Sequence, residues 1–379
     1  MKTKKINFKS FITKGNKTNI WLLSSTILLV LIGFIFVYSA SSYSAELNYG
    51  NKFYFLTKQI IGAVLGFVAL IITSKIDYRV YNKFKLPILI VGIVLLAIVF
   101  IPGLGVSNYG AQRWIRLPGF TIQPSEIAKF CFVIFCAGYL AKNKDIVKSF
   151  KGILPILCIG GIICVLIMLE PNMSITICVG LTMFLMLFIG GAKIKHFVIL
   201  SVPVIALGFL LILMEPYRLQ RLVAFINPWA NPQGEGYQLI QSLYSLGSGG
   251  LFGVGLFNSR QKYLFLPFSE SDFIFSIIGE ETGFLGCLTI ILIFGVLIYQ
   301  GIKIAFSAKD RFGCYLASGI ISIIATQVLV NIAVVTGSIP PTGVPLPFIS
   351  AGSTALVVFM ASIGILLNID RESRKNMIQ

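Results

Sequence analysis

Long apolar runs alternate with short polar connections along most of the chain. Each run is close to the roughly 20 residues that an α-helix needs to cross the hydrocarbon core of a bilayer. Helices are the expected form, because backbone groups find no water to bond with in lipid. The pattern predicts an all-α, polytopic membrane protein, a bundle of ten transmembrane helices near residues 20–41, 55–74, 86–103, 125–141, 152–169, 173–190, 196–214, 273–302, 312–336 and 345–368.

One connection is much longer than the others. Residues 215–271, between the seventh and eighth runs, exceed what a simple link between neighbouring helices requires. We interpret this stretch as a large outer loop, which shares its side of the membrane with a shorter polar segment near residue 113. The chain then divides into a basic tail (1–19), one transmembrane domain (20–370) and a second tail (371–379).

Composition supports the membrane class and excludes others. The chain is 56% hydrophobic and 12% charged, with a mean hydropathy of +0.88, which a water-soluble domain would not tolerate on its surface. The basic residues behind the net charge of +17 are scattered over many connections. With no aromatic-rich soluble module beside them, they do not indicate a nucleic-acid partner.

The placement of lysine and arginine predicts the orientation. With the N-terminus inside, the inner segments hold 22 of these residues and the outer loops hold seven. Because cytoplasmic loops retain positive charge, we expect both termini in the cytoplasm and the large loop outside. The membrane lipids are then the immediate surroundings of the domain.

Cysteine and histidine offer little chemistry. All seven cysteines fall within apolar runs or near their inner ends, where they are expected to act as packing residues. The only histidine, His196, stands at the inner end of the seventh run. A His/Cys metal site is therefore not expected.

The stretch LPFSESDFIFSIIGEE, residues 266–281, places acids where lipid would penalise them. A charge deep in hydrocarbon costs on the order of 3 kcal/mol, so Glu280 and Glu281 need a polar cavity or a partner. Because adjacent residues on a helix point about 100° apart, at most one of these two side chains can face a given cavity directly, and the other needs a partner of its own. Asp272, at the outer end of the run, is either an N-cap of the helix or a catalytic carboxylate.

Glu126 and Lys129 form the other intramembrane charge pair. Their i,i+3 spacing puts both side chains on one face of the fourth helix, where they can pair. A purely structural ion pair and a role at a substrate cavity both remain open from the residues alone. Glu170, in the short turn between the fifth and sixth runs, is as consistent with a surface role as with any other.

Several long motifs, in order, resemble the SEDS family of bacterial membrane proteins, which includes FtsW, RodA and SpoVE. They are GAQRWIRLPGFTIQPSEIAKF, NPQGEGYQLIQSLYSLGSGGLFGVGL, RQKYLFLP, DFIFSIIGEE and PPTGVPLPFIS. The resemblance covers roughly residues 20–370. The phrase NPWANPQGEGYQ is closer to the division and sporulation branch than to the elongation branch.

The resemblance implies a peptidoglycan glycosyltransferase of the bacterial cytoplasmic membrane. Such an enzyme polymerises lipid II onto a glycan linked to undecaprenyl pyrophosphate, on the outer face, together with a class B penicillin-binding protein. Asp272 matches the catalytic aspartate of the family, and Glu280 and Glu281 are expected to support it. The positions that the resemblance places at or near the substrate are Arg113, Glu126, Lys129, Arg218, Arg221, Gln261, Lys262 and Ser350.

This assignment agrees with the chemistry that the reaction requires. A sugar hydroxyl is a poor nucleophile at neutral pH, so a positioned carboxylate is needed as general base. The departing pyrophosphate builds negative charge that arginine and lysine stabilise. No organic cofactor is expected, and a divalent cation, Mg²⁺ or Mn²⁺, is a further candidate at the pyrophosphate.

The motifs also depart from the family pattern close to the aspartate. The family usually has Pro-Glu and His-Thr before it, where this chain has Phe268, Glu270 and Ser271. Asn172 and Ala351 replace an aspartate and a tyrosine in two other motifs. These changes leave open a catalytically weak scaffold for the penicillin-binding protein, and the buried charges leave open a lipid II flippase.

Overall fold

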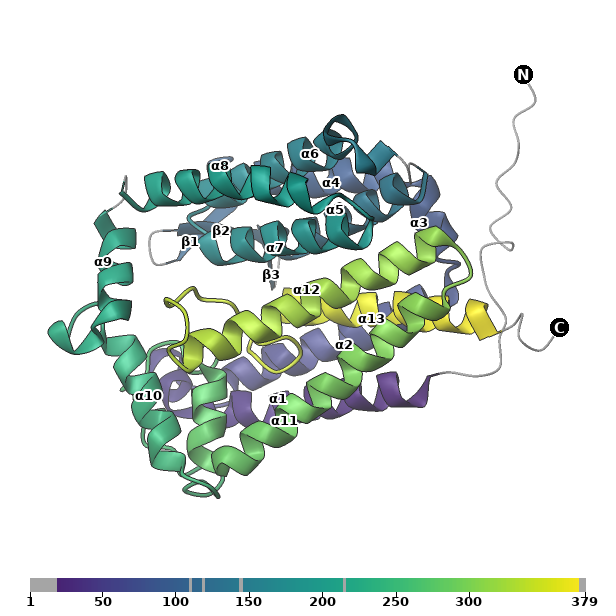
Figure 1. The fold of residues 1–379 in the computed structure, drawn as a ribbon. Helices are drawn as coiled ribbons and strands as arrows, with labels where there is room; N and C mark the ends of the chain where they lie inside the picture. Colours follow the sequence, from purple (N-terminus) through teal and green to yellow (C-terminus); the bar gives the residue numbers. More distant parts are fainter. Residues whose placement is uncertain (1–18, 109–110, 118–119, 143–145, 214–215, 375–379) are drawn as a thin grey trace.

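The computed structural model describes residues 19–108, 111–117, 120–142, 146–213 and 216–374. Each predicted apolar run contains one long helix, and the helices lie side by side (Figure 1). They are α1 (Ile20–Tyr49), α2 (Tyr54–Lys75), α4 (Lys85–Ile98), α5 (Pro124–Lys142), α6 (Phe150–Leu169), α7 (Met173–Ile189), α8 (Ile194–Leu213), α11 (Ile274–Ser307), α12 (Arg311–Val335) and α13 (Ser353–Arg374).

The membrane class is confirmed. Within the described residues, seven of these helices are long and apolar enough to cross a bilayer. Three more, α4, α7 and α8, are apolar but fall below the length limit in their described parts. The fold is thus helical and multi-pass, while the count of ten crossings stays a prediction.

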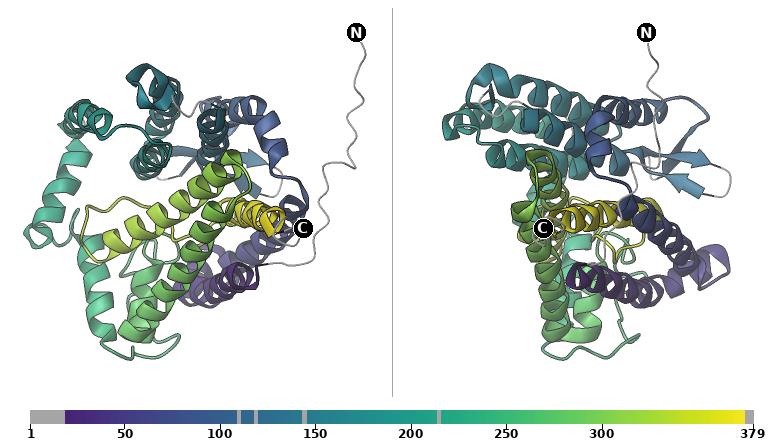
Figure 2. Two further views of the ribbon diagram at one scale, coloured as in Figure 1. Left: turned by 45° about the vertical axis from the view of Figure 1, so that its right-hand side comes forward. Right: turned by 90° about the vertical axis from the view of Figure 1, so that its right-hand side faces the viewer.

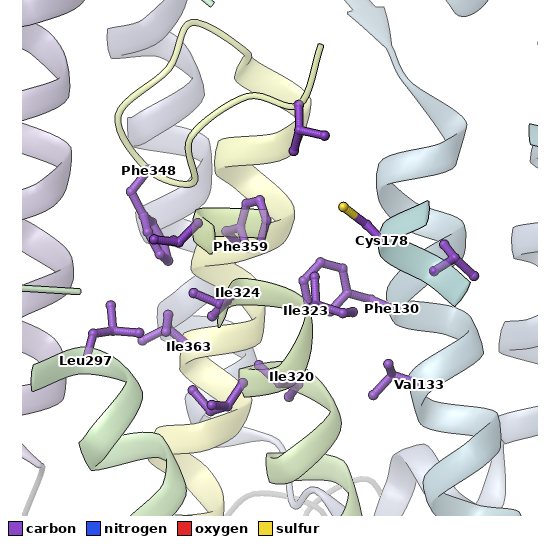
Figure 3. Packing of buried hydrophobic residues seen from close by; sticks show 14 of the residues in the cluster. Phe130, Val133, Cys178, Leu297, Ile320, Ile323, Ile324, Phe348, Phe359 and Ile363 are labelled. Atoms are coloured by element: carbon purple, nitrogen blue, oxygen red, sulfur yellow. The ribbon is translucent and has the colours of Figure 1, made fainter. Parts of the chain in front are cut away.

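The core lies where α5, α12 and α13 meet. Phe130 of α5, Ile323 of α12 and Phe359 of α13 point toward one another in the close view (Figure 3). Two further views show the remaining helices arranged around this centre (Figure 2). Apolar side chains outside the core face outward, as lipid allows, so the polar side chains buried inside the bundle need partners within the protein.

The predicted outer loop is not structureless. Residues 215–271 contain α9 (Pro216–Ile226), the short 3₁₀ helix η3 (Pro228–Ala230) and α10 (Tyr237–Gly249). Gly249, the last residue of α10, allows close packing, because a Cβ there would lie 2.0 Å from the Gly279 carbonyl oxygen. Gly283 has a φ of 67° and marks a kink in α11 where the loop backbone packs against it.

A small sheet was not predicted by the all-α interpretation. Strands β1 (Gly105–Asn108), β2 (Ala111–Leu117) and β3 (Phe120–Ile122) pair in antiparallel order β1-β2-β3. The segment is too short and too polar to cross a bilayer, and its aromatic and β-branched residues suit a pleated surface. Trp114 faces Val106, and Ile115 faces Ile122.

The last predicted run was wrong in its first part. Residues 338–352, here called the proline segment, are not helical, and α13 begins only at Ser353. Proline lacks the backbone N–H that a helix interior needs, which explains why this stretch cannot continue a helix. It is nevertheless buried, with Val344, Leu346 and Ile349 all at most 1% exposed.

Two short helices complete the described chain. They lie in connections between the longer ones, at positions where the sequence places polar and basic residues. They are α3 (Arg79–Lys83) and the 3₁₀ helix η2 (Ile146–Lys148).

Candidate active site

Asp272 lies in the turn that leads into α11. The helix begins at Ile274, its N-cap residue is Phe273, and no side chain caps it. The interpretation of Asp272 as an N-cap is therefore wrong. Its carboxylate is not used to satisfy the free N–H groups of the helix.

The proline segment holds this turn by its backbone. Ser350 donates from Oγ to the carbonyl oxygen of Ser271 at 2.6 Å and accepts from the Leu346 amide at 2.7 Å. The Ala351 amide donates to the Glu270 carbonyl oxygen at 2.9 Å. Ser350, predicted near the substrate, is thus placed as a brace for the residues directly before Asp272.

Asn331 of α12 braces the turn from the other side. Its Nδ2 donates to the carbonyl oxygens of Asp272, at 2.8 Å, and of Val344, at 2.6 Å. The side chain is buried, so water does not compete for these hydrogen bonds. Sequence analysis missed this residue, although an amide inside the apolar run 312–336 was a usable signal.

Asp272 carries a perturbed carboxyl group. Burial raises its pKa from 3.8 to about 6, and the nearby Glu270 carboxyl raises it further. The positive charges of Arg113 and Arg221 oppose this rise. The group is therefore largely ionised at neutral pH but close enough to its pKa to accept a proton, as a general base requires.

Two arginines reach this turn from separate elements. Arg113 of β2 donates from Nε to the Glu170 carbonyl oxygen at 3.2 Å and also bonds the Pro171 carbonyl oxygen. Arg221 of α9 donates to the Pro341 carbonyl oxygen at 3.3 Å. The sheet and the large loop thus bring positive charge to Asp272, and a role of either arginine toward substrate stays a prediction. Arg218 also lies on α9, but its side chain is outside the described residues.

Glu170, whose role the sequence left open, is a second acid at this end, and its burial rules out a surface role. It is fully buried, and neither carboxyl oxygen has a hydrogen-bond partner among the described residues. Burial raises its pKa to about 8, against the opposing charge of Arg113. At neutral pH the group is mostly protonated, so it adds little negative charge beside Arg113. Asn172, two residues after Glu170, caps α7: its Oδ1 accepts from the Ile175 backbone N–H.

Glu126 and Lys129 form a buried ion pair, with 2.7 Å between Lys129 Nζ and Glu126 Oε2. Lys129 also donates to Gln327 Oε1 at 2.7 Å. Gln327 in turn donates to the Pro345 carbonyl oxygen at 3.2 Å. The pair therefore supports the proline segment through α12, and a contact with substrate stays a prediction.

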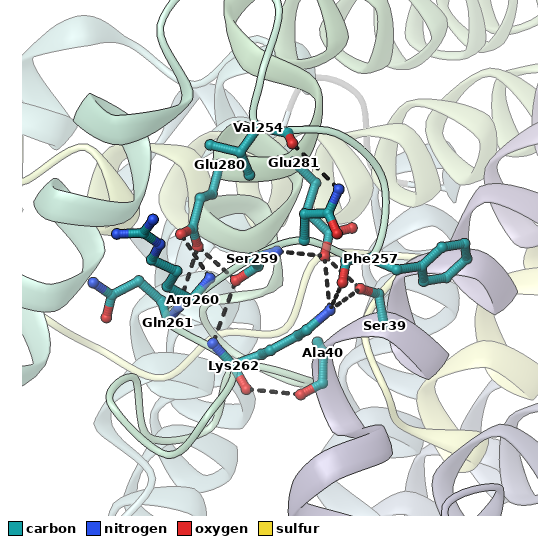
Figure 4. A network of polar contacts seen from close by, with 12 residues as sticks. Ser39, Ala40, Val254, Phe257, Ser259, Arg260, Gln261, Lys262, Glu280 and Glu281 are labelled. Carbon is teal, nitrogen blue, oxygen red and sulfur yellow. Dashed lines mark hydrogen bonds and ion pairs between the residues drawn. The ribbon is translucent and has the colours of Figure 1, made fainter.

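Glu280 and Glu281 have partners of their own, drawn in Figure 4. Glu280 accepts from Ser259 Oγ at 2.5 Å and from the Arg260 amide at 2.9 Å. Glu281 accepts from Ser39 Oγ of α1 at 2.5 Å. Both acids are buried and fix the loop to the bundle, which accounts for their presence inside an apolar helix.

Lys262 belongs to the same cluster. Its Nζ lies 3.3 Å from Glu281 Oε1 and donates to the Phe257 carbonyl oxygen. It also lines a cavity of about 520 Å³ between α1 and the loop. The backbone N–H of Gln261 donates to Glu280 Oε2 at 3.4 Å. The contacts of both residues run to α1 and α11, and a role toward substrate stays a prediction.

A divalent cation gains no support from the protein side chains. Within the described ranges, no three His, Cys, Asp or Glu residues gather closely enough to hold a metal ion. Mg²⁺ in phosphate-transfer sites is commonly held by only one or two carboxylates together with substrate phosphates and water. A divalent cation at the pyrophosphate therefore stays a prediction.

Gly343 approaches the carboxylate closely. A Cβ at this position would lie 3.0 Å from Asp272 Oδ2, and the residue has a φ of 76°, which favours glycine. We expect Gly343→Ala to push the carboxylate from its position and to cost roughly 1 kcal/mol in stability. Activity should fall about tenfold or more, since small misplacement of a reacting group is costly. Gly161→Ala, at an open position inside α6, is the control: it should leave activity unchanged and leave stability the same or higher, because alanine is favoured over glycine within a helix.

The chain is similar over most of its length to proteins of one known family. The family profile of FtsW, RodA and SpoVE, described as "Cell cycle protein", matches residues 19–375. The chain belongs to this family. It is 42% identical to Stage V sporulation protein E of Bacillus subtilis, over 96% of this chain and 99% of that protein. It is 39% identical to a probable peptidoglycan glycosyltransferase FtsW of Geobacter metallireducens, over 96% of this chain and 97% of the relative.

Solved structures of family members share the fold. One, from work on polymerization and crosslinking by a peptidoglycan synthase complex, has a TM-score of 0.77 at 25% identity and covers 94% of this chain and 98% of its own. RodA of Thermus thermophilus has a TM-score of 0.69 at 23% identity, with 94% and 97% covered. The FtsW/RodA/SpoVE fold therefore holds for nearly the whole chain.

Proposed function

We propose that the chain is a peptidoglycan glycosyltransferase that polymerises lipid II on the outer face of the bacterial cytoplasmic membrane. Relatives near 40% identity over most of the chain carry that name or a sporulation name. The excess of lysine and arginine on one set of connections supports an orientation with both termini in the cytoplasm. The Asp272 turn then faces outward, where both lipid-linked substrates present their sugars.

One observation carries the proposal. Asp272 is fixed through its backbone by Asn331, while its carboxylate lies within the electrostatic reach of Arg113 and Arg221. A base needs a fixed position, and a departing diphosphate needs positive charge nearby. Both requirements meet at this turn.

The reaction then proceeds in one displacement. Asp272 accepts the proton of the attacking sugar hydroxyl as that oxygen bonds to the anomeric carbon of the lipid-linked strand. The bond from that carbon to the pyrophosphate oxygen breaks, and undecaprenyl pyrophosphate leaves with the electron pair. Arg113 and Arg221 stabilise the charge that develops on the leaving group.

A class B penicillin-binding protein is the partner that the family suggests. A solved family structure comes from work on a peptidoglycan synthase complex that couples polymerization to crosslinking. A transpeptidase beside this chain would crosslink the strands as they form. The sequence similarity places the chain nearer to division and sporulation proteins than to elongation proteins.

The rate of strand synthesis is expected to rise with pH through about 6 and to level off above it. The ionised carboxylate is the acting form, and the pKa of Asp272 is raised to about 6 by burial. Initial rates measured from about pH 5 to about pH 8 would show this limb. Glu270→Gln removes a repelling neighbour and should move the limb to lower pH. A flat profile across this range would contradict the assignment of Asp272 as the base.

The deciding experiment is polymerisation of lipid II by the purified chain, alone and with its co-purifying partner. Glycan strands longer than the disaccharide unit, made by either preparation, are the expected product. Movement of lipid II across liposomes without any polymer would instead identify a flippase. The control is Asp272→Asn. If this variant yields as much polymer as the wild type, the polymer comes from a contaminating enzyme, and the proposal is overturned.

A further inference from the structure

A second polar cavity lies at the opposite end of the bundle from Asp272, where α1 begins and α13 ends. It has a volume of about 350 Å³. Nothing in the proposed reaction uses this end of the protein. The cavity is lined by Asn19, Ile20, Trp21, Gln300, Lys303 and Arg374.

Side-chain hydrogen bonds hold the cavity in shape. Asn19 caps α1 by accepting from the Leu22 amide at 3.1 Å. Its Nδ2 also donates to Gln300 Oε1 of α11 at 3.3 Å. The start of α1 is thereby fixed against α11, and the positive end of the α1 dipole lies at the cavity wall.

The charge around the cavity is positive. Lys303 of α11 and Arg374 of α13 both line it, and Arg374 Nε pairs with Oδ2 of Asp370 at 2.9 Å. Two cations against one carboxylate leave a net positive charge. An anionic group is therefore the fitting ligand.

The rim of the cavity is apolar and exposed. Ile20 and Trp21 are 75% and 68% exposed at the start of α1. Tryptophan is typical of the level at which headgroups meet the hydrocarbon. The outward faces of both flanking helices continue this apolar surface along the bundle, through Leu28, Leu31 and Ile35 of α1 and Val296, Tyr299 and Ile302 of α11.

We propose that this cavity binds the headgroup phosphate of an anionic phospholipid. The phosphodiester lies between Lys303 and Arg374, the amide of Gln300 offers a further donor, and the acyl chains follow the apolar faces of α1 and α11. A soluble phosphate would use the same cations but would leave the exposed rim unused. Basic pockets between membrane helices are a known type of lipid site. The inference does not depend on the proposed function.

The test uses the full chain in two settings. In detergent, we expect phosphatidylglycerol to stay bound through purification, as native mass spectrometry detects. In nanodiscs of phosphatidylcholine, we expect added phosphatidylglycerol to raise the thermal unfolding midpoint. Lys303→Gln should weaken this lipid's apparent affinity about fivefold, the usual effect of one basic residue near a membrane surface. Lys151→Gln removes the same charge from an exposed position on α6 outside the cavity, and is the matched control.

Two outcomes would overturn the inference. Equal losses in Lys303→Gln and Lys151→Gln would mean that general surface charge attracts the lipid. Equal stabilisation by soluble glycerol phosphate would mean that the cavity takes free phosphate rather than lipid. Arg374→Gln is the poorer probe, because it also leaves the Asp370 carboxylate without its 2.9 Å partner. Polymerisation of lipid II is not the readout, so failure here leaves the proposed function unaffected.

Discussion

Asp272→Asn is expected to abolish glycan synthesis while the protein still folds, inserts and binds its partner. Asparagine has nearly the same shape as aspartate but cannot accept the hydroxyl proton. Loss of a general base typically costs about 10² to 10⁴ in rate. Lipid II polymerisation by the purified complex, followed by the length of the glycan strands, measures the effect directly.

The stability of this variant separates catalysis from folding. The folded pKa of Asp272 is raised above its ordinary value, so its ionised form is disfavoured by the fold. For such an acid, stability is lost as pH rises from about 4 toward about 6. At neutral pH the asparagine variant should therefore unfold at the same temperature as the wild type or a higher one. Glu270→Gln, two residues away, should remain active at neutral pH. Polymerisation at the wild-type rate by Asp272→Asn would refute the assignment.

The helices and the acid at the site followed from the sequence because both leave local signals. Apolar length marks a membrane helix, and a carboxylate such as Asp272 at the lip of an apolar run signals a polar environment. Arg113 and Arg221 were expected on the same face as this acid, because the two polar segments that hold them lie outside the apolar runs; their role toward substrate stays a prediction. These features need no knowledge of how distant segments pack.

The roles of the residues that support the site could not be assigned from local pattern, even where, as for Asn331, a polar residue in an apolar run marked them. Asn331 acts through the backbone of Asp272, 59 residues earlier in the chain. Residues 345–352 of the proline segment are predicted as helix because they are largely apolar, whereas in the structure they form irregular backbone packed beside the site. Glu170 stood in a short turn, and its burial depends on contacts with segments distant in sequence. Sequence pattern reports local periodicity, while these roles depend on tertiary contacts.

The acids of α11 show how one pattern can have two meanings. Asp272, Glu280 and Glu281 all stand in or beside the same apolar run. Yet Glu280 and Glu281 are bonded to Ser259, Ser39 and Lys262, whereas Asp272 uses only its carbonyl oxygen in the brace to Asn331. A charged residue in an apolar run therefore indicates that partners are needed. Whether its carboxylate is bonded within the protein decides whether its role is structural or chemical.

Lys129→Met is expected to be the most destabilising of the single substitutions considered. It leaves the Glu126 carboxylate without its cation in a site where both side chains are at most 3% exposed. Breaking a buried ion pair by removing one partner typically costs about 3–5 kcal/mol. Unfolding in a mixed-detergent titration, monitored by tryptophan fluorescence, would measure the loss in free energy.

The double variant Glu126→Gln with Lys129→Met decides what that loss means. If the cost comes from the uncompensated carboxylate, neutralising it should restore most of the stability, because no charge remains buried. Activity should recover less than stability, since Gln327 would still lack the lysine that bonds its Oε1 while its Nε2 holds the Pro345 carbonyl oxygen of the proline segment. Full recovery of both would show that the brace is independent of the pair. No recovery of either would mean that Lys129 stabilises the bundle through Gln327 and its packing on Phe359 rather than through Glu126.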